Sequence, residues 1–122
     1  MKRIHQNLKV YKLAFDLALE IFTLTRKFPK EETYSLTSQM VRSSRSVCAN
    51  LAEAYRKRRY PKAFMAKLSD AEAEASETQT WLEFCLTCGY LTEQKQKELI
   101  IQYDHVIGML VNMSRAPEKW KI

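Results

Sequence analysis

Apolar residues recur at helical spacing through four successive stretches of the chain. In the first stretch, two adjoining stripes of apolar residues cover an arc of about 200°, which is wider than a surface helix needs. Breaks in the pattern follow prolines and glycine, at Pro29, Pro61, Gly89 and Pro117. The pattern predicts helices over about 8–28, 35–59, 61–88 and 92–114, within a single domain of residues 1–122.

Residues at the predicted helix ends have side chains that suit those positions. Ser35 and Thr92 can each accept a free backbone N–H at a helix start. Pro61 fits the first turn of a helix, where no backbone N–H is needed. Gly89 suits the left-handed conformation that follows many helices. Four such helices joined by short loops predict an all-α, antiparallel up-down four-helix bundle.

The composition supports a globular helical protein. Hydrophobic residues make up 46% of the chain and charged residues 28%, with only two glycines and three prolines. No apolar run reaches the length of about 18 residues that a membrane helix needs, and no signal-peptide core follows Met1. Three cysteines, an odd number, agree with a reducing compartment. We therefore expect a cytoplasmic protein.

The first and fourth predicted helices have more apolar surface than a four-helix core requires. Large apolar patches on soluble proteins usually mark contact sites. The surplus therefore favours self-association, and irregular packing within one bundle is the alternative.

The formal net charge of +6 is distributed unevenly along the chain. Residues 42–67 contain eight lysines and arginines but only one acid, Glu53. Residues 70–83 contain five acids and no base. Such segregation fits either recognition of a polyanion or pairing between the second and third helices.

The basic residues of the second helix form a stripe at helical spacing. Arg42, Arg45, Arg56 and Arg59 share one predicted face with small residues between them. These side chains could follow a phosphate backbone, while a nearby tyrosine, Tyr55 or Tyr60, stacks on an unpaired base. Pairing with the acidic third helix, or simple solvation, is the alternative. The candidate nucleic-acid contacts are Arg42, Arg45, Arg56, Lys57, Arg58, Arg59 and Lys62.

No constellation of residues predicts catalysis. Cys85 and Cys88 form a C-x-x-C motif, but it lies at a helix C-terminus, which disfavours a thiolate, and lacks two further zinc ligands. The glutamates of the third helix are not accompanied by the Glu-x-x-His motif of di-iron bundles. Phosphate and dinucleotide loops are also missing from the sequence. We expect a non-enzyme without metal or cofactor, in which the cysteines serve packing.

Four segments of the chain carry a family resemblance through their order and spacing. They are Phe28-Pro-Lys-Glu-Glu-Thr-Tyr-Ser-Leu-Thr-Ser-Gln-Met40, Asn50-Leu-Ala-Glu-Ala54, Arg58-Arg59 and Gly89-Tyr-Leu91. Together they resemble the four-helix-bundle family named after the large-subunit rRNA intervening-sequence protein, and the resemblance extends from Val10 to the fourth helix. In that family the second helix often ends in Asn-Ile-Ala-Glu-Gly with a further glycine, whereas this chain has Ala54 and Lys57.

The resemblance implies an antiparallel four-helix protomer assembled as a homopentameric barrel, in a bacterial protein. It also implies a link to the accessory subunit of diversity-generating retroelements, which binds nucleic acid and a reverse transcriptase. Our leading hypothesis is a non-catalytic oligomer whose basic face binds RNA or DNA. The rival is a protein-interaction scaffold without nucleic-acid contact, which would depend on Trp81 or the fourth helix.

Overall fold

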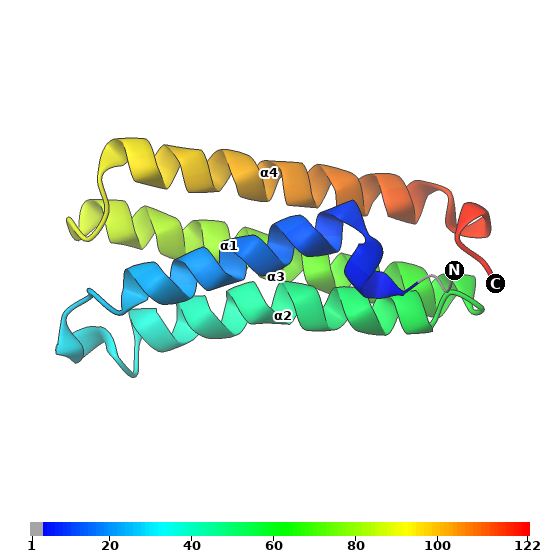
Figure 1. Cartoon of the computed structure of the whole chain (residues 1–122), viewed down its shortest axis with the longest axis horizontal. Helices are drawn as coiled ribbons and strands as arrows, with labels where there is room; N and C mark the ends of the chain where they lie inside the picture. Colours follow the sequence, from blue (N-terminus) through cyan, green and yellow to red (C-terminus); the bar gives the residue numbers. More distant parts are fainter. Residues whose placement is uncertain (1–3) are drawn as a thin grey trace.

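The computed structural model describes residues 4–122, which form four long helices and contain no strand. The helices run alternately in opposite directions, and each packs against two neighbours, so that α1, α2, α3 and α4 follow one another around a ring (Figure 1). The predicted antiparallel four-helix bundle is confirmed. The elements are η1 (His5–Asn7), α1 (Lys9–Thr25), η2 (Lys30–Glu32), α2 (Leu36–Arg56), α3 (Pro61–Thr87), α4 (Glu93–Arg115) and η3 (Pro117–Lys119).

The interior is filled by large side chains from all four helices. Ile21 of α1, Met40 and Leu51 of α2, Phe64 of α3 and Tyr103 of α4 are all fully buried. Full burial of one large apolar side chain stabilises a fold by about 1.5–3 kcal/mol. The core therefore joins the four helices, as the apolar stripes of the sequence predict.

Local chemistry defines both ends of the α3–α4 connection. Gly89 has a φ of 77°, and the N–H of Tyr90 donates to the carbonyl of Cys85 at 2.8 Å, which closes α3 with a Schellman motif. The hydroxyl of Thr92 accepts a hydrogen bond from the N–H of Lys95 at 3.1 Å and caps α4. These features agree with the glycine and threonine positions predicted from the sequence.

The first two helices end earlier than the sequence pattern predicts. α1 ends at Thr25 instead of Phe28, because the chain must turn before Pro29 and the Phe28 ring packs 5.0 Å from the Tyr90 ring. α2 ends at Arg56 instead of Arg59. Residues 57–60 form a turn, because a residue that precedes proline disfavours helical geometry.

The prediction that the Ser35 side chain caps α2 is wrong. The Ser35 hydroxyl donates to the Glu32 carboxylate at 2.7 Å, and this carboxylate also accepts a hydrogen bond from the Leu36 N–H at 3.4 Å. The Tyr90 hydroxyl donates to the other Glu32 oxygen at 2.7 Å. These hydrogen bonds lower the pKa of Glu32 and raise the pKa of Tyr90 to about 12. Glu32 therefore links the α1–α2 and α3–α4 connections.

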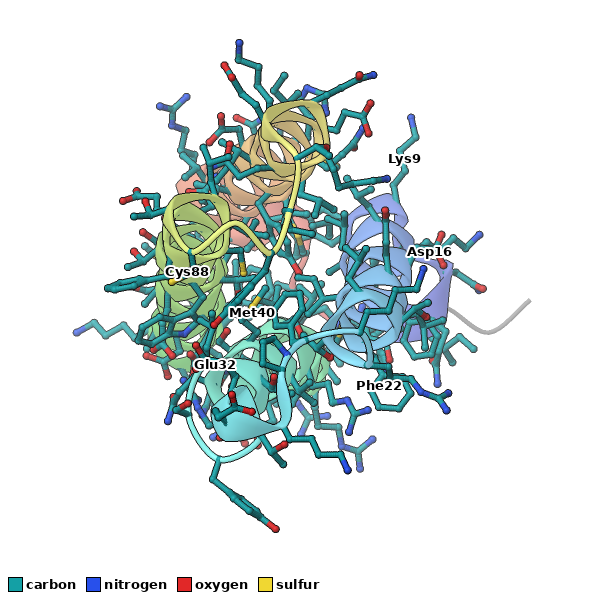
Figure 2. All side chains as sticks on the ribbon, turned by 90° about the vertical axis from the view of Figure 1, so that its left-hand side faces the viewer. Lys9, Asp16, Phe22, Glu32, Met40 and Cys88 are labelled. Carbon is teal, nitrogen blue, oxygen red and sulfur yellow. The ribbon has the colours of Figure 1, made fainter. Side chains whose placement is uncertain are left out.

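Apolar side chains remain exposed on the outer face of α1. Ala14 and Ala18 are buried, whereas Phe15 is 45% exposed, Leu19 52% and Phe22 40%. Seen along the bundle, Phe22 lies on the outside of α1 and Met40 in the interior (Figure 2). On α4, Ile101 is 49% exposed. Within residues 4–122, no helix is both long and apolar enough to cross a membrane.

The Tyr103 hydroxyl is the one buried side-chain polar atom in residues 4–122 that lacks a hydrogen-bond partner. Burial also raises the pKa of Tyr103. By contrast, the buried hydroxyls of Ser43 and Thr78 are 2.8 Å apart and satisfy each other. An unsatisfied buried hydroxyl destabilises a fold by about 1–3 kcal/mol, so its position in the core is unfavourable.

We therefore expect Tyr103→Phe to raise the free energy of unfolding by about 1 kcal/mol, because it removes the unsatisfied hydroxyl and keeps the ring. Urea unfolding at a fixed protein concentration measures the change. Tyr34→Phe is the control, since Tyr34 is 94% exposed and its hydroxyl is solvated. A Tyr103→Phe protein less stable than the parent would show that the hydroxyl has a stabilising partner.

Candidate nucleic-acid interface

The run of four basic residues lies at the junction between α2 and α3. Arg56 is the last residue of α2, and Lys57 follows as its C-cap. The N–H of Lys57 donates to the Ala54 carbonyl at 2.9 Å, and the N–H of Tyr60 donates to the Lys57 carbonyl at 2.9 Å. The four basic residues therefore lie at the end of α2 and in the tight turn that follows it. The partial negative charge at the C-terminal end of the helix stabilises these cations.

Arg58 has a structural contact as well as a charge. Its Nε donates to the Tyr55 carbonyl at 2.7 Å, and its guanidinium lies 3.6 Å from the centre of the Tyr55 ring. Tyr55 is itself buried. The Tyr55 carbonyl also accepts the Arg58 backbone N–H, at a longer 3.4 Å. The short hydrogen bond from Nε and the stacking on an aromatic face together fix the guanidinium.

A cleft of about 650 Å³ lies beside this turn, and we call it the end cleft. It is formed by the C-terminal end of α2, the turn after it, η1 and the last residue of the chain. Figure 1 shows η1 and the C-terminal end of the chain at this end of the bundle. Within residues 4–122, no aspartate or glutamate side chain lines it. The lining residues are Ile4, His5, Gln6, Ala52, Tyr55, Arg56, Arg58, Arg59, Tyr60 and Ile122.

Arg42 is engaged by the acidic residues of α3. Its Nη1 donates to Glu74 at 3.1 Å, and its Nη2 donates to the Glu77 carboxylate as well. These interactions raise the pKa of Arg42 and lower the pKa of Glu74, which also accepts a hydrogen bond from Ser46 at 2.9 Å. Arg42 therefore forms the ion pairs between α2 and α3 that the sequence offered as the alternative to polyanion recognition.

Arg45 lies on the other side of α2, next to α1. Its guanidinium is 5.2 Å from the centre of the Phe22 ring, and Arg26 lies 5.8 Å from the same ring. Arg56 comes eleven positions after Arg45, which is close to three whole helical turns. Arg45 and Arg56 therefore share one face, whereas Arg42 turns toward α3.

Most of the other candidate residues are open to solvent. Arg56, Lys57, Arg59 and Lys62 are exposed, and Arg58 is half-buried. Among the described residues, these five and Arg45 form no salt bridge with an acidic side chain. Arg42 therefore differs from the other candidate residues, which form no salt bridge with an acidic side chain among the described residues.

His5 is a cleft residue that the sequence pattern does not reveal. It lines the end cleft, and its ring lies 4.8 Å from the Tyr11 ring in an edge-to-face arrangement. About fifty positions separate His5 from Arg56 in the sequence, so no local spacing connects them. Only the antiparallel packing of α1 on α2 brings η1 to this end of α2.

The two cysteines of the C-x-x-C motif have different environments. Cys85 is buried, and its Sγ lies 3.3 Å from Met40 Sδ, whereas Cys88 is exposed beyond the end of α3. Burial raises the pKa of Cys85 to about 12, which opposes a reactive thiolate. Within residues 4–122, no group of three or more metal-ligating side chains is suitably placed to hold a metal ion.

Comparisons with known proteins agree with this architecture. The chain is similar to a crystallised protein of unknown function from the S23 ribosomal protein family of Bacteroides thetaiotaomicron, with a TM-score of 0.78 and 25% identity over 87% of this chain and 95% of that one. Among curated proteins, none matches. The family model described as the 23S rRNA-intervening sequence protein matches residues 6–112, and the chain therefore belongs to that family.

Proposed function

We propose that the protein is a non-catalytic nucleic-acid-binding bundle that contacts the phosphate backbone of RNA or DNA through α2 and the turn after it. The observation that carries the proposal is the group formed by Arg45, Arg56, Arg58 and Arg59, which have no acidic partner among the described residues. Lys57 and Lys62 extend this group across the turn. We call these six residues the basic end.

Charge and exposure support this proposal. Guanidinium groups match phosphate oxygens with two parallel hydrogen bonds, and exposed ones can meet a ligand without losing an internal contact. The family description names an rRNA intervening sequence, which agrees with an association with nucleic acid. We leave Arg42 out of the proposed contacts, because binding phosphate would require it to leave Glu74 and Glu77.

A salt titration tests the proposal directly. Four phosphate contacts predict that the logarithm of the binding constant falls with the logarithm of salt concentration, with a slope of about −3 for a single strand. Fluorescence anisotropy with a labelled single-stranded RNA, a single-stranded DNA and a duplex measures this slope. A binding constant that does not change with salt, or no binding to any of the three, would contradict the proposal.

We also propose that the protomer self-associates through α1 and α4, and the family resemblance implies five copies. The exposed apolar side chains Phe15 and Leu19 on α1 and Ile101 on α4 support this contact. We expect Phe15→Glu combined with Leu19→Glu to lower the mass in solution to that of a protomer, because burying a carboxylate opposes association.

Light scattering measures that mass. Ser76→Glu combined with Thr80→Glu is the matched control, because both are exposed polar residues four positions apart on α3, outside the proposed contact. The control variant should keep the mass of the parent protein. A monomeric parent at micromolar concentration would contradict the self-association proposal.

A protein partner is the second candidate function, and one observation favours it. Trp81 and Phe84 line a cleft of about 390 Å³ near the start of α2 and the end of α3, and Phe84 is 52% exposed. This cleft lies far from the basic end along α3. Binding that persists at high salt and is lost in Phe84→Ala would favour this function over nucleic-acid binding.

A further inference from the structure

We infer that the end cleft holds the unpaired terminal nucleotide of a nucleic-acid strand, with its terminal phosphate on Arg58 and its base on Tyr60. The inference rests on the proposed function, since the rest of the strand would lie on the other cations of the basic end. It differs from that function in assigning a preference for strand ends. Four observations carry it: the fixed guanidinium of Arg58, the exposed ring of Tyr60, the size and charge of the cleft, and the shared face of Arg45 and Arg56 on α2.

Arg58 is held in place before any ligand arrives. Its Nε is bound to the Tyr55 carbonyl and its guanidinium rests on the Tyr55 ring, so little side-chain freedom remains to be lost on binding. Its two Nη groups have no hydrogen-bond partner among the described residues, and the residue lines the cleft. A fixed guanidinium with two free N–H-bearing groups suits a planar pair of phosphate oxygens.

Tyr60 supplies an aromatic face on which, among the described residues, no other ring and no cation stacks. It is 60% exposed, although it lines the cleft and immediately precedes α3. The other cleft tyrosine, Tyr55, is covered by Arg58. A free aromatic face at the rim of a basic cleft is the feature by which proteins bind unpaired bases.

The size and charge of the end cleft fit one nucleotide. Its volume of about 650 Å³ lies within the range of roughly 300–1,000 Å³ typical of small-ligand sites. Ile4 and Ile122 give it apolar walls, and the part of the lining that the structure describes has three arginines and no aspartate or glutamate side chain. A terminal phosphate has a charge close to −2, compared with −1 for a phosphate inside a strand, so this cleft favours the terminal group.

The rest of the strand has a path away from the cleft. Arg45 and Arg56 share a face of α2 and lie about 16 Å apart along the helix axis. Arg56 lines the cleft, whereas Arg45 lies beyond it, next to α1. A strand that begins in the cleft therefore passes over a second arginine. A base-paired end does not fit the same arrangement, because its terminal base is held by its complement and cannot turn toward Tyr60.

Fluorescence anisotropy with matched oligonucleotides tests the inference. The probes are one single-stranded sequence with a phosphate at the 5′ end, at the 3′ end or at neither, and the blunt duplex of that sequence. We expect removal of the favoured terminal phosphate to weaken binding about tenfold, and pairing of the end to weaken it by a similar factor. Unlabelled adenosine monophosphate, added as a competitor, should displace the strand only at far higher concentration.

Two variants separate the proposed contacts. Arg58→Lys keeps the charge but loses the planar guanidinium, so the preference for the terminal phosphate should fall to about twofold or less. Tyr60→Leu should weaken the single strand about tenfold. Tyr34→Leu is its control, because Tyr34 is an exposed tyrosine in the α1–α2 connection and does not line the end cleft. Each variant is first required to retain the helical circular dichroism of the parent.

The outcomes distinguish this inference from the proposed function. If no probe binds, both fail. If all probes bind equally, with a salt slope and no effect of Tyr60→Leu, the basic end binds nucleic acid and the end cleft does not select strand ends. If adenosine monophosphate competes as well as the strand does, the cleft binds a free nucleotide and the strand-end inference is overturned.

Discussion

Simultaneous replacement of Arg45, Arg56 and Arg59 by alanine is expected to weaken binding of a single-stranded RNA by at least about tenfold at low salt. The slope of the logarithm of the binding constant against the logarithm of salt should decrease in magnitude by about 2, since three phosphate contacts are lost. None of the three arginines forms a salt bridge among the described residues, so replacing them removes no intramolecular ion pair. Arg58 is retained because it caps α2.

Two control variants test whether the position of the removed charges, and not their number, weakens binding. Lys27→Ala, Lys30→Ala and Lys97→Ala together remove the same charge from exposed positions in the α1–α2 connection and near the start of α4, none of which lines the end cleft. Arg42→Ala with Glu74→Ala removes a salt bridge and leaves the net charge unchanged. Both controls should bind within about twofold of the parent. Equal weakening by the two triple variants would mean that net charge, and not the basic end, determines binding.

Phe64→Ala is expected to lower the free energy of unfolding by about 3–5 kcal/mol. Phe64 is fully buried in the first turn of α3, next to the α2–α3 turn that presents the basic end. Its truncation removes a large apolar ring and leaves a cavity that neighbouring helices cannot readily fill. Because a domain of this size is stable by only about 5–15 kcal/mol, the loss is a large share of the total.

Met65→Ala is the matched control for Phe64→Ala. Met65 occupies the next position of α3 and is 39% exposed, so its truncation should cost about 1 kcal/mol or less. Urea unfolding followed by helical circular dichroism, at one fixed protein concentration, compares the two variants with the parent. Equal unfolding midpoints for the two variants would contradict the core position of Phe64.

Residues that act within their own turn could be interpreted from the sequence. Pro61 begins α3, Gly89 follows its end with positive φ, and Thr92 caps α4. These positions depend on backbone geometry over three or four residues, which the residue type largely determines. The same reasoning failed at Ser35, because its hydroxyl donates to the Glu32 carboxylate of the preceding turn, and Glu32 instead accepts the hydrogen bond from the Leu36 N–H.

The early end of α2 has a comparable cause. A basic residue has good helix propensity, so the pattern predicts that α2 extends to Arg59. The structure ends α2 at Arg56, because the chain needs the following residues to reverse direction before Pro61. This difference moves Arg58 and Arg59 from the predicted helix to the turn, where they line the end cleft.

The amino-acid sequence by itself determined four amphipathic helices, their order, a segregated charge and the family. Hydrophobic periodicity and end chemistry are local, and they survive any arrangement of the helices in space. Only the tertiary structure decided which cations are paired. Arg42 and Glu74, distant in the sequence, meet because α2 packs on α3, and Arg45 turns to Phe22 because α2 also packs on α1. Likewise, η1 and the α2–α3 turn form one cleft only because antiparallel packing brings them to the same end.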